Sequence, residues 1–482
     1  MDTAKLKENK GLIFGTILAI VAFFAIYLMP LPAGMTIEGQ KSLALFTFGL
    51  IMWITRPIPI YLTSILIVLL LPLLGAVDSQ KVAFGTLGFD IIWLMVAAFV
   101  LTSAMSSTNL GKRIALTLVT KFAKTPTQTL IVFVVVNFIL AFFVPSTTAR
   151  ASLLVPICLV ILEIFKAAPG ESKFGKLMML QGVQVNGIAT SVVMTATSAQ
   201  VLAVGFINEQ AGGNVGYLQW ILGSIPQAII TTVLAFIAGL FLFNYKDEFS
   251  ETVGEGKIAD QLKAQLDELG PMSIGEKKAA LIFLFTLLSW ATGDYHEDWF
   301  GFEISTEQTA VISMFLCLMP GIGVITWKQA NIKWDLMLFS AGAYAVGNAV
   351  NDTGGATWVI DKLINATGLD KLPPSTVAVA LIFISIFSHL IFTSKTVRTT
   401  ILIPAIIVLA RQLGLDPVAL ALACSYGIAY TITLPPHSKV NTLYFGTGYF
   451  SVKDELVYGL ITCFIGSVAI SLVYFTWINV IL

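Results

Sequence analysis

A polar phrase occurs twice in an otherwise apolar chain. The first copy, VPSTTARASLLVPI, covers residues 144–157, and the second, TSKTVRTTILIPAI, covers residues 393–406. Each copy places adjacent hydroxyl or ammonium groups beside an arginine and a proline. Hydroxyl, ammonium and guanidinium groups all donate hydrogen bonds, so the chemistry that this combination suggests is anion binding.

The two copies are part of a longer internal repeat. Three pairs of residues are each 248 positions apart: Ser146 and Ser394, Arg150 and Arg398, Pro156 and Pro404. Two further blocks recur in the same order: Gly187-Ile188-Ala189 with Gly427-Ile428-Ala429, and residues 107–111 with residues 351–355. Internal repeats with broken helices are a common plan of secondary transporters. The hydropathy favours an odd number of spans in each half, which would make the repeats inverted.

The first copy predicts a helix break. Pro145 removes a backbone donor and disfavours a helical conformation at the preceding residue. Ser146, Thr147 and Thr148 are natural N-caps for a helix that starts near Ala149. The exposed amides and the positive end of the helix dipole would then form an anion site at membrane depth.

The second copy offers the same geometry with an added cation, because Ser394, Lys395 and Thr396 occupy the equivalent positions. Two such helix starts, one from each half, would face one another and suit a ligand with two carboxylates. The alternative is that these Ser and Thr residues only link membrane helices through hydrogen bonds.

Three basic residues lie in or directly after these breaks, and no acidic residue is close to them in the sequence. Lys395, Arg150 and Arg398 therefore lack a counter-ion that an anionic substrate could supply. For both arginines the alternative is a structural role, bonding to the carbonyl ends of helices.

A second pair of breaks follows in each half. The candidate substrate-binding residues there are Thr197, Ser198, Pro436 and His437. His437 either contacts the substrate or only bonds within its own loop. We expect His389 to be a core residue and His296 to lie in a solvated loop.

The composition indicates a polytopic membrane protein. The chain has 482 residues, of which 56% are hydrophobic and 12% charged, against about 25% charged residues in soluble domains. The formal net charge of zero suggests no nucleic-acid partner. The four cysteines lie in apolar runs without metal-ligand spacing, so we predict neither a metal site nor a cofactor. Lys5, Lys7 and Lys10 precede the first apolar run and predict a cytoplasmic N-terminus in the cell membrane.

A charged connector divides the chain near its midpoint. We expect a first repeat half at 1–244, a polar connector at 245–276 and a second repeat half at 277–482. Hydrophobic residues in the connector recur at helical spacing: Ile258, Leu262, Leu266 and Leu269. This pattern predicts either an amphipathic helix at the membrane interface or a solvated helical linker.

Several motifs resemble one family. Arg56-Pro57-Ile58-Pro59, followed by Thr63-Ser64, is similar to an early signature of the divalent anion/sodium symporter (DASS) family, the INDY-type dicarboxylate carriers. The segments at 146–148 and 394–396 lie where that family carries two Ser-Asn-Thr motifs. The residues 145–150 and Phe445-Gly446-Thr447-Gly448-Tyr449 most resemble its bacterial dicarboxylate exchangers, the antiporter branch.

The resemblance implies an all-α polytopic fold. It would have about eleven transmembrane helices and two re-entrant helical hairpins, near 84–108 and 333–351. It would also have two inverted repeats, a scaffold and a transport domain, an elevator-type movement and a homodimeric assembly.

The departures from the family pattern bear on mechanism. Both motif asparagines are absent, Lys395 stands in place of one of them, and Thr197-Ser198 stands where sodium-coupled members have Thr-Pro-Pro. A fixed ammonium would replace sodium, and an empty carrier would hold unpaired positive charge in the membrane. We therefore expect sodium-independent obligate exchange of C4 or C5 dicarboxylates such as malate, succinate, fumarate and 2-oxoglutarate. The alternative is a sodium-coupled dicarboxylate symporter, followed by an anion channel. No nucleophile–base constellation suggests an enzyme.

Overall fold

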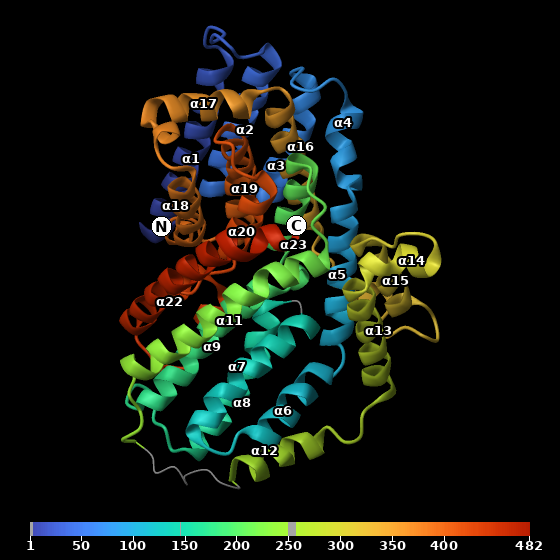
Figure 1. Ribbon diagram of the computed structural model, residues 1–482, viewed down its shortest axis with the longest axis vertical. Coiled ribbons are helices and arrows are strands. Elements are labelled where there is room, and N and C mark those ends of the chain that lie inside the picture. Colours follow the sequence, from blue (N-terminus) through green and yellow to red (C-terminus); the bar gives the residue numbers. More distant parts are fainter. Residues whose placement is uncertain (1–2, 145, 249–256) are drawn as a thin grey trace.

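Every regular element in the computed structural model is a helix within the residues that it describes, 3–144, 146–248 and 257–482 (Figure 1). The expected all-α class is therefore confirmed for these residues. Pro145 lies outside the described residues. The side chains of Lys5, Lys7, Lys10 and Ile258 lie outside them as well.

The first part of the chain forms α1 (Thr3–Tyr27), α2 (Ile37–Thr55), α3 (Ile60–Leu73), α4 (Gln80–Gly85), α5 (Asp90–Ser106), α6 (Leu110–Phe122), α7 (Pro126–Phe143), α8 (Thr147–Ile164), α9 (Lys173–Val192), η2 (Met194–Ala196), α10 (Ser198–Phe206) and α11 (Tyr217–Leu242). The second part forms α12 (Lys257–Glu268), α13 (Ile274–Ala291), α14 (His296–Phe300), α15 (Thr306–Leu318), α16 (Trp334–Asp352), α17 (Gly355–Thr367), α18 (Pro374–Phe387), α19 (Lys395–Gln412), α20 (Pro417–Ile428), η8 (Pro435–His437), α21 (Lys439–Phe445) and α22 (Val452–Val473).

The order of elements repeats between the two parts of the chain. The series α6 to α11, with the short turn η2 before α10, matches the series α17 to α22, with η8 before α21. The helices α8 and α19 are both 18 residues long, and they start 248 positions apart. The helices before them, α7 and α18, each have a proline in the first turn, where its missing N–H needs no partner. The sequence repeat is therefore also a repeat of helices.

Five helical stretches in the described residues are long and apolar enough to cross a membrane: Gln80–Ser106, Pro126–Phe143, Thr147–Ile164, Tyr217–Leu242 and Val452–Ile481. Shorter apolar helices accompany them. In Figure 1 the helices α11 and α22, which pack on each other, run diagonally across the molecule above α9. Because α9 is buried along almost its whole length, its polar side chains must find partners inside the protein.

The expected positions of the two hairpins are wrong. Residues 90–106 and 334–352 form the unbroken helices α5 and α16. Short interruptions occur instead between α7 and α8 and between α18 and α19, at the repeated polar phrases. The resemblance to the family had implied hairpins at the two earlier segments, but the chain is interrupted at the polar phrases.

The polar connector contains the amphipathic helix α12, which packs against α6 near the lower edge of the molecule in Figure 1. Leu262 is fully buried in this contact, and Leu266 and Leu269 are partly buried against the core. The apolar face of α12 therefore rests on the protein itself, which differs from both a solvated linker and a helix that only lies on the membrane.

An ion pair fixes α6 to the start of α13. Arg113 Nε donates to Glu276 Oε1 at 2.8 Å, and Arg113 Nη1 donates to the carbonyl oxygen of Gly270 at 2.9 Å. Glu276 also completes a capping box with Ser273 in the first turn of α13. The hydrogen bond from Arg113 holds the pKa of the Glu276 carboxyl below its ordinary value, because it stabilises the charged form.

Close packing of α3 on α16 gives a test of this fold. A Cβ atom added to Gly342 would lie 2.4 Å from Ser64 Cβ and 2.8 Å from Ser64 Cα, so the helices would have to separate. We expect Gly342→Ala to lower the stability of the purified protein by about 1–3 kcal/mol, measured as a fall in melting temperature in detergent. Gly85→Ala is the control, since a Cβ there meets nothing within 4 Å. Equal melting temperatures for the two variants would contradict this packing.

Candidate functional site

The first polar phrase interrupts a helix and caps the next one. The helix α7 ends at Phe143 and α8 begins at Thr147, with Ser146 as its N-cap in an extended conformation. Ser146 Oγ accepts a hydrogen bond from the backbone N–H of Ala149 at 3.3 Å. The Asn186 side chain, from α9, donates to the carbonyl oxygen of Thr147 at 3.2 Å and holds the helix start in place.

The second polar phrase does the same in the other half. Ser394 caps α19, and its Oγ accepts from the backbone N–H of Val397 at 3.4 Å. Serine is a preferred N-cap because its hydroxyl satisfies an amide that the helix cannot. Lys395 is the first residue of α19, as Thr147 is of α8, so the two phrases form equivalent helix starts.

Two further interruptions lie beside these helix starts. The chain leaves α9 at Val192, makes the turn η2 and enters α10 at Ser198, and it leaves α20 at Ile428 and enters α21 at Lys439. In the second interruption, the Asn441 amide donates to the carbonyl oxygens of Thr431 at 3.0 Å and Leu434 at 2.9 Å. This side chain supplies donors to carbonyls that no longer lie in a helix.

Hydrogen bonds connect the two halves at the breaks. Thr399, one turn into α19, donates through Oγ1 to the carbonyl oxygen of Ala199 in the first turn of α10 at 3.2 Å. Thr197 Oγ1 in turn donates to Gln200 Oε1 at 3.0 Å, and the Gln200 amide donates to the carbonyl oxygen of Thr190. The start of α19 is thereby linked to α10 and α9.

The two repeated arginines are both fully buried but have different partners. Arg398 donates to Ser388 Oγ at 2.8 Å, to the carbonyl oxygen of Ile428 at 3.2 Å and to two carbonyls near the end of α18. Arg150 donates through Nη2 to Thr190 Oγ1, while its Nε and Nη1 are buried without a partner in the described residues. Arg398 thus has the contacts expected of a structural arginine, whereas Arg150 keeps unused donors.

The other predicted site residues of the second half form a separate group. Lys395 is half-buried and lies within electrostatic range of both Arg398 and Arg150. Thr433 Oγ1 lies 3.0 Å from His437 Nδ1 and 2.8 Å from His389 Nε2. His389 is buried with both ring nitrogens bonded, as expected for a core residue.

His296 differs from its prediction. It does not lie in a solvated loop: it is buried in α14, with Nε2 at 3.2 Å from Thr292 Oγ1 and its ring near Trp299 and Phe300. Aromatic neighbours, which the acidic residues around it did not suggest, cover the ring. The four cysteines, Cys158, Cys317, Cys424 and Cys463, are buried and free, as expected of core residues.

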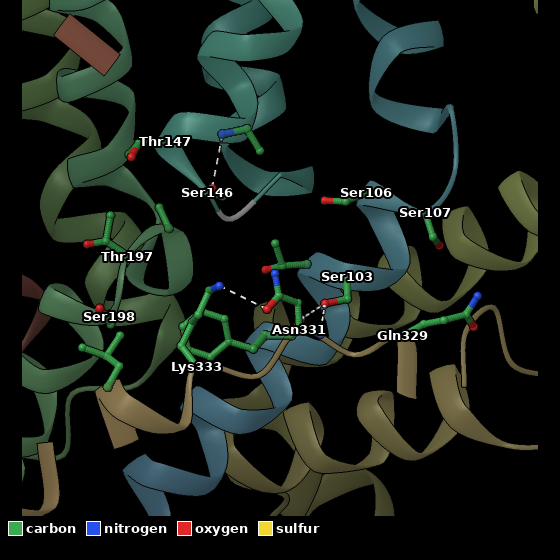
Figure 2. A pocket seen from close by; sticks show the side chains of 15 residues that line it. Ser103, Ser106, Ser107, Ser146, Thr147, Thr197, Ser198, Gln329, Asn331 and Lys333 are labelled. Atoms are coloured by element: carbon green, nitrogen blue, oxygen red, sulfur yellow. Dashed lines mark hydrogen bonds between the residues drawn. The ribbon is translucent and has the colours of Figure 1, made fainter. Parts of the chain in front are cut away.

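A cavity of about 600 Å³ opens at the starts of α8 and α10 (Figure 2). Four predicted substrate-binding residues line it: Ser146, Thr147, Thr197 and Ser198. Six others do not line it: Thr148, Ser394, Lys395, Thr396, Pro436 and His437. The structure therefore places four residues of the first half on the cavity, whereas Thr148 and the five residues of the second half lie outside its lining.

The far wall of the cavity consists of residues that the sequence did not identify. These come from the end of α5 and from the loop before α16: Ser103, Ser106, Ser107, Gln329, Asn331 and Lys333. The three serines have the spacing i, i+3, i+4 of one helix face, which is a signal that could have marked them. No local signal connects them with a loop more than 200 residues away.

Comparisons with known proteins give the family. A family model described as "Sodium:sulfate symporter transmembrane region" matches residues 10–482. The chain belongs to this family. It is therefore a multi-pass membrane protein of a transporter family, and the expectation that it is not an enzyme is confirmed.

The relatives cover nearly the whole chain. A membrane protein of Cupriavidus necator is 28% identical over 97% of this chain and 93% of its own length. The sodium-dependent dicarboxylate transporter SdcS of Staphylococcus saprophyticus is 26% identical over 97% of this chain and 92% of its own. The fold is similar to the YdaH transporter of Alcanivorax borkumensis, with a TM-score of 0.57 and 14% identity, covering 83% of this chain and 88% of that one. The comparisons support the DASS family but not its antiporter branch, because the relatives named by substrate are sodium-dependent transporters.

Because the two arginines have different partners, we predict that their replacement has different effects on the stability of the protein. Arg398→Met removes four hydrogen bonds of a buried guanidinium that join the ends of α18 and α20, so we expect a loss of about 3 kcal/mol or more, seen as a large fall in melting temperature in detergent. Arg150→Met removes a buried charge that has one hydrogen-bond partner, so its melting temperature should fall little or rise. Equal losses in the two variants would show that Arg150 has partners equivalent to those of Arg398.

Proposed function

We propose that this chain is a secondary transporter of dicarboxylates. The cavity at the starts of α8 and α10 is the observation that carries this proposal. It is lined by hydroxyls and helix N-termini, and none of the lining residues that the structure describes is acidic. Backbone amides at a helix N-terminus favour negative charge, and hydroxyls add donors of adjustable direction.

The positive charges of Lys395 and Arg150 support a substrate with two negative charges. Lys395, at the start of α19, is within electrostatic range of Arg150, which carries unused donors. Thr399 connects this helix start to α10, whose first residue, Ser198, lines the cavity. One carboxylate would lie between the starts of α8 and α19, and the other would lie toward the open part of the cavity. The relatives named as dicarboxylate transporters support the same substrate class.

The proposed architecture follows the family and the repeat of helices. We assign the two re-entrant hairpins to α7–α8 and α18–α19, in a chain of about eleven transmembrane helices with two inverted repeats. Scaffold and transport domains, an elevator-type movement and a homodimer in the cell membrane, with the N-terminus cytoplasmic, complete the proposal. The matching series α6–α11 and α17–α22 supports the repeat, and the interruptions between α7 and α8 and between α18 and α19 support the hairpins.

Two coupling modes are compatible with this site. The comparisons favour sodium-coupled uptake, because the named relatives are sodium-dependent. Lys395 favours sodium-independent exchange, because a resident ammonium near two arginines supplies positive charge without a metal ion. An exchanger of this kind would return across the membrane only when a substrate neutralises it.

Uptake of radiolabelled succinate into liposomes tests the proposal and separates the two modes. We expect saturable uptake that unlabelled malate and fumarate inhibit. Sodium coupling predicts uptake into empty vesicles that requires an inward sodium gradient. Exchange predicts uptake only into vesicles preloaded with a dicarboxylate, with or without sodium. Current without stimulation from the opposite side would indicate a channel, and absence of any dicarboxylate uptake would refute the proposed substrate.

Replacement of Lys395 by Asn tests the role of the ammonium. Loss of one charge-assisted hydrogen bond is worth about 1.5–3 kcal/mol, so we expect KM for succinate to rise roughly tenfold or more. If the protein is an exchanger, the variant should also show less dependence on internal substrate. Lys371→Asn, an exposed lysine in the same half, is the matched control. An unchanged KM in Lys395→Asn would remove this residue from the site.

A further inference from the structure

The wall of the cavity opposite the α8 start has a chemistry of its own. Ser103, Ser106 and Ser107 lie on one face at the C-terminal end of α5, and the loop before α16 runs beside them. Figure 2 shows these serines and the side chain of Lys333 across the open space from Ser146. The Ser103 and Ser107 hydroxyls donate to the carbonyl oxygens of Phe99 and Ala104 within α5 at 2.8 and 2.9 Å. The Ser106 hydroxyl and the Lys333 ammonium are therefore the donors that this wall offers to an anion.

Hydrogen bonds hold Lys333 at the cavity. The backbone N–H of Asn331 donates to Ser103 Oγ at 2.9 Å, which fixes the loop to α5. Lys333 Nζ then donates to Asn331 Oδ1 at 3.1 Å, a contact drawn in Figure 2. These two hydrogen bonds connect α5 with Asn331 and Asn331 with Lys333, and they orient the Lys333 side chain toward the cavity.

The charge of Lys333 is not neutralised by a neighbouring acid. Among the described residues that line the cavity, Lys333 is the one that carries a charge, and none is acidic. The ion pairs found in the described residues join Arg113 with Glu276 and Lys176 with Asp454, so Lys333 belongs to neither. A cation without an acidic partner in a concave, hydroxyl-lined space raises the local concentration of anions.

We propose that Lys333, together with the hydroxyl of Ser106, forms an anion subsite on the α5 wall. It receives the carboxylate that points away from the start of α8. The identity of the anion as a dicarboxylate rests on the proposed function, whereas the existence of the subsite rests on the cavity. Lys333 is thus a specificity-determining residue that favours substrates with a second negative charge.

A thiol placed in the subsite measures its electrostatic potential directly. The four native cysteines are buried, and Ser106 is exposed, so Ser106→Cys introduces an accessible thiol into an otherwise unreactive background. Its reaction rates with a negatively charged and a positively charged methanethiosulfonate reagent are compared in the full-length protein. We expect the ratio, anionic over cationic, to fall by about 25-fold when Lys333→Gln is added, because one unit charge at about 4 Å in water changes each rate about fivefold, in opposite directions for the two reagents.

A matched control lies in the same loop. Lys328→Gln makes the same change of charge at an exposed residue that does not line the cavity, and it should leave the ratio unchanged. An unchanged ratio in Lys333→Gln, or an equal fall in Lys328→Gln, overturns the proposal. Ser107→Cys provides a second thiol position on the same wall if Ser106→Cys fails to fold.

Protection of the thiol by anions separates this proposal from the proposed function. Succinate should slow modification of Ser106→Cys by a neutral maleimide. Lys333→Gln should raise the succinate concentration needed for half-maximal protection several-fold. A charge-dependent reagent ratio without protection by succinate, but with protection by sulfate, would keep the subsite and refute the dicarboxylate. Protection by succinate that Lys333→Gln leaves unchanged would keep the dicarboxylate and refute the subsite.

Discussion

Backbone groups that an interrupted helix releases must find partners inside an apolar protein, and the rest of this site depends on how the chain meets that requirement. Serine hydroxyls cap the new helices at Ser146 and Ser394. Asn441 supplies donors to two carbonyls of the interruption that precedes α21, and the Gln184 amide reaches the carbonyl oxygen of Ile432 at 3.1 Å. Two polar side chains of the buried helix α9, Gln184 and Asn186, therefore bond to carbonyls at the breaks, and the breaks in turn make a polar cavity possible within a hydrophobic protein.

The two halves meet this requirement with the same helix order but with different electrostatics. In the second half, Arg398 joins the carbonyl ends of α18 and α20, where the negative ends of helix dipoles favour a cation. In the first half, Arg150 bonds to one threonine and keeps two buried nitrogens without a partner in the described residues. The open cavity adjoins the first half, on the side where donors remain unused. The two halves thus share the same helix starts, whereas only Arg398 has the contacts of a structural arginine.

The repeat itself could be predicted from sequence, because a proline, a cap and an arginine at fixed spacing impose a local conformation. Ser146 caps α8 and Ser394 caps α19 at equivalent positions, although α8 begins at Thr147, two residues before the predicted start near Ala149. The hairpins could not be placed by apolar length, since an unbroken helix such as α5 and a helix that turns back have the same hydropathy. The far wall of the cavity was missed for another reason: the bond from Asn331 to Ser103 joins residues 228 positions apart, and only the fold brings them together.

The source of positive charge decides how a carrier of this fold is coupled. Carbonyl groups of the protein already stabilise the charge of Arg398, so this arginine does not need an anionic substrate as a partner. Lys395 and Arg150 remain, and no ion pair within 4.0 Å joins either of them to an acid in the described residues. Unpaired charge is costly in the membrane interior, so an anion with two charges stabilises the protein at the point where its own residues cannot. A bound sodium ion would add positive charge beside Lys395 and raise the repulsion there, which favours a site for any such ion on the other side of the substrate, near the hydroxyl-lined starts of α8 and α10.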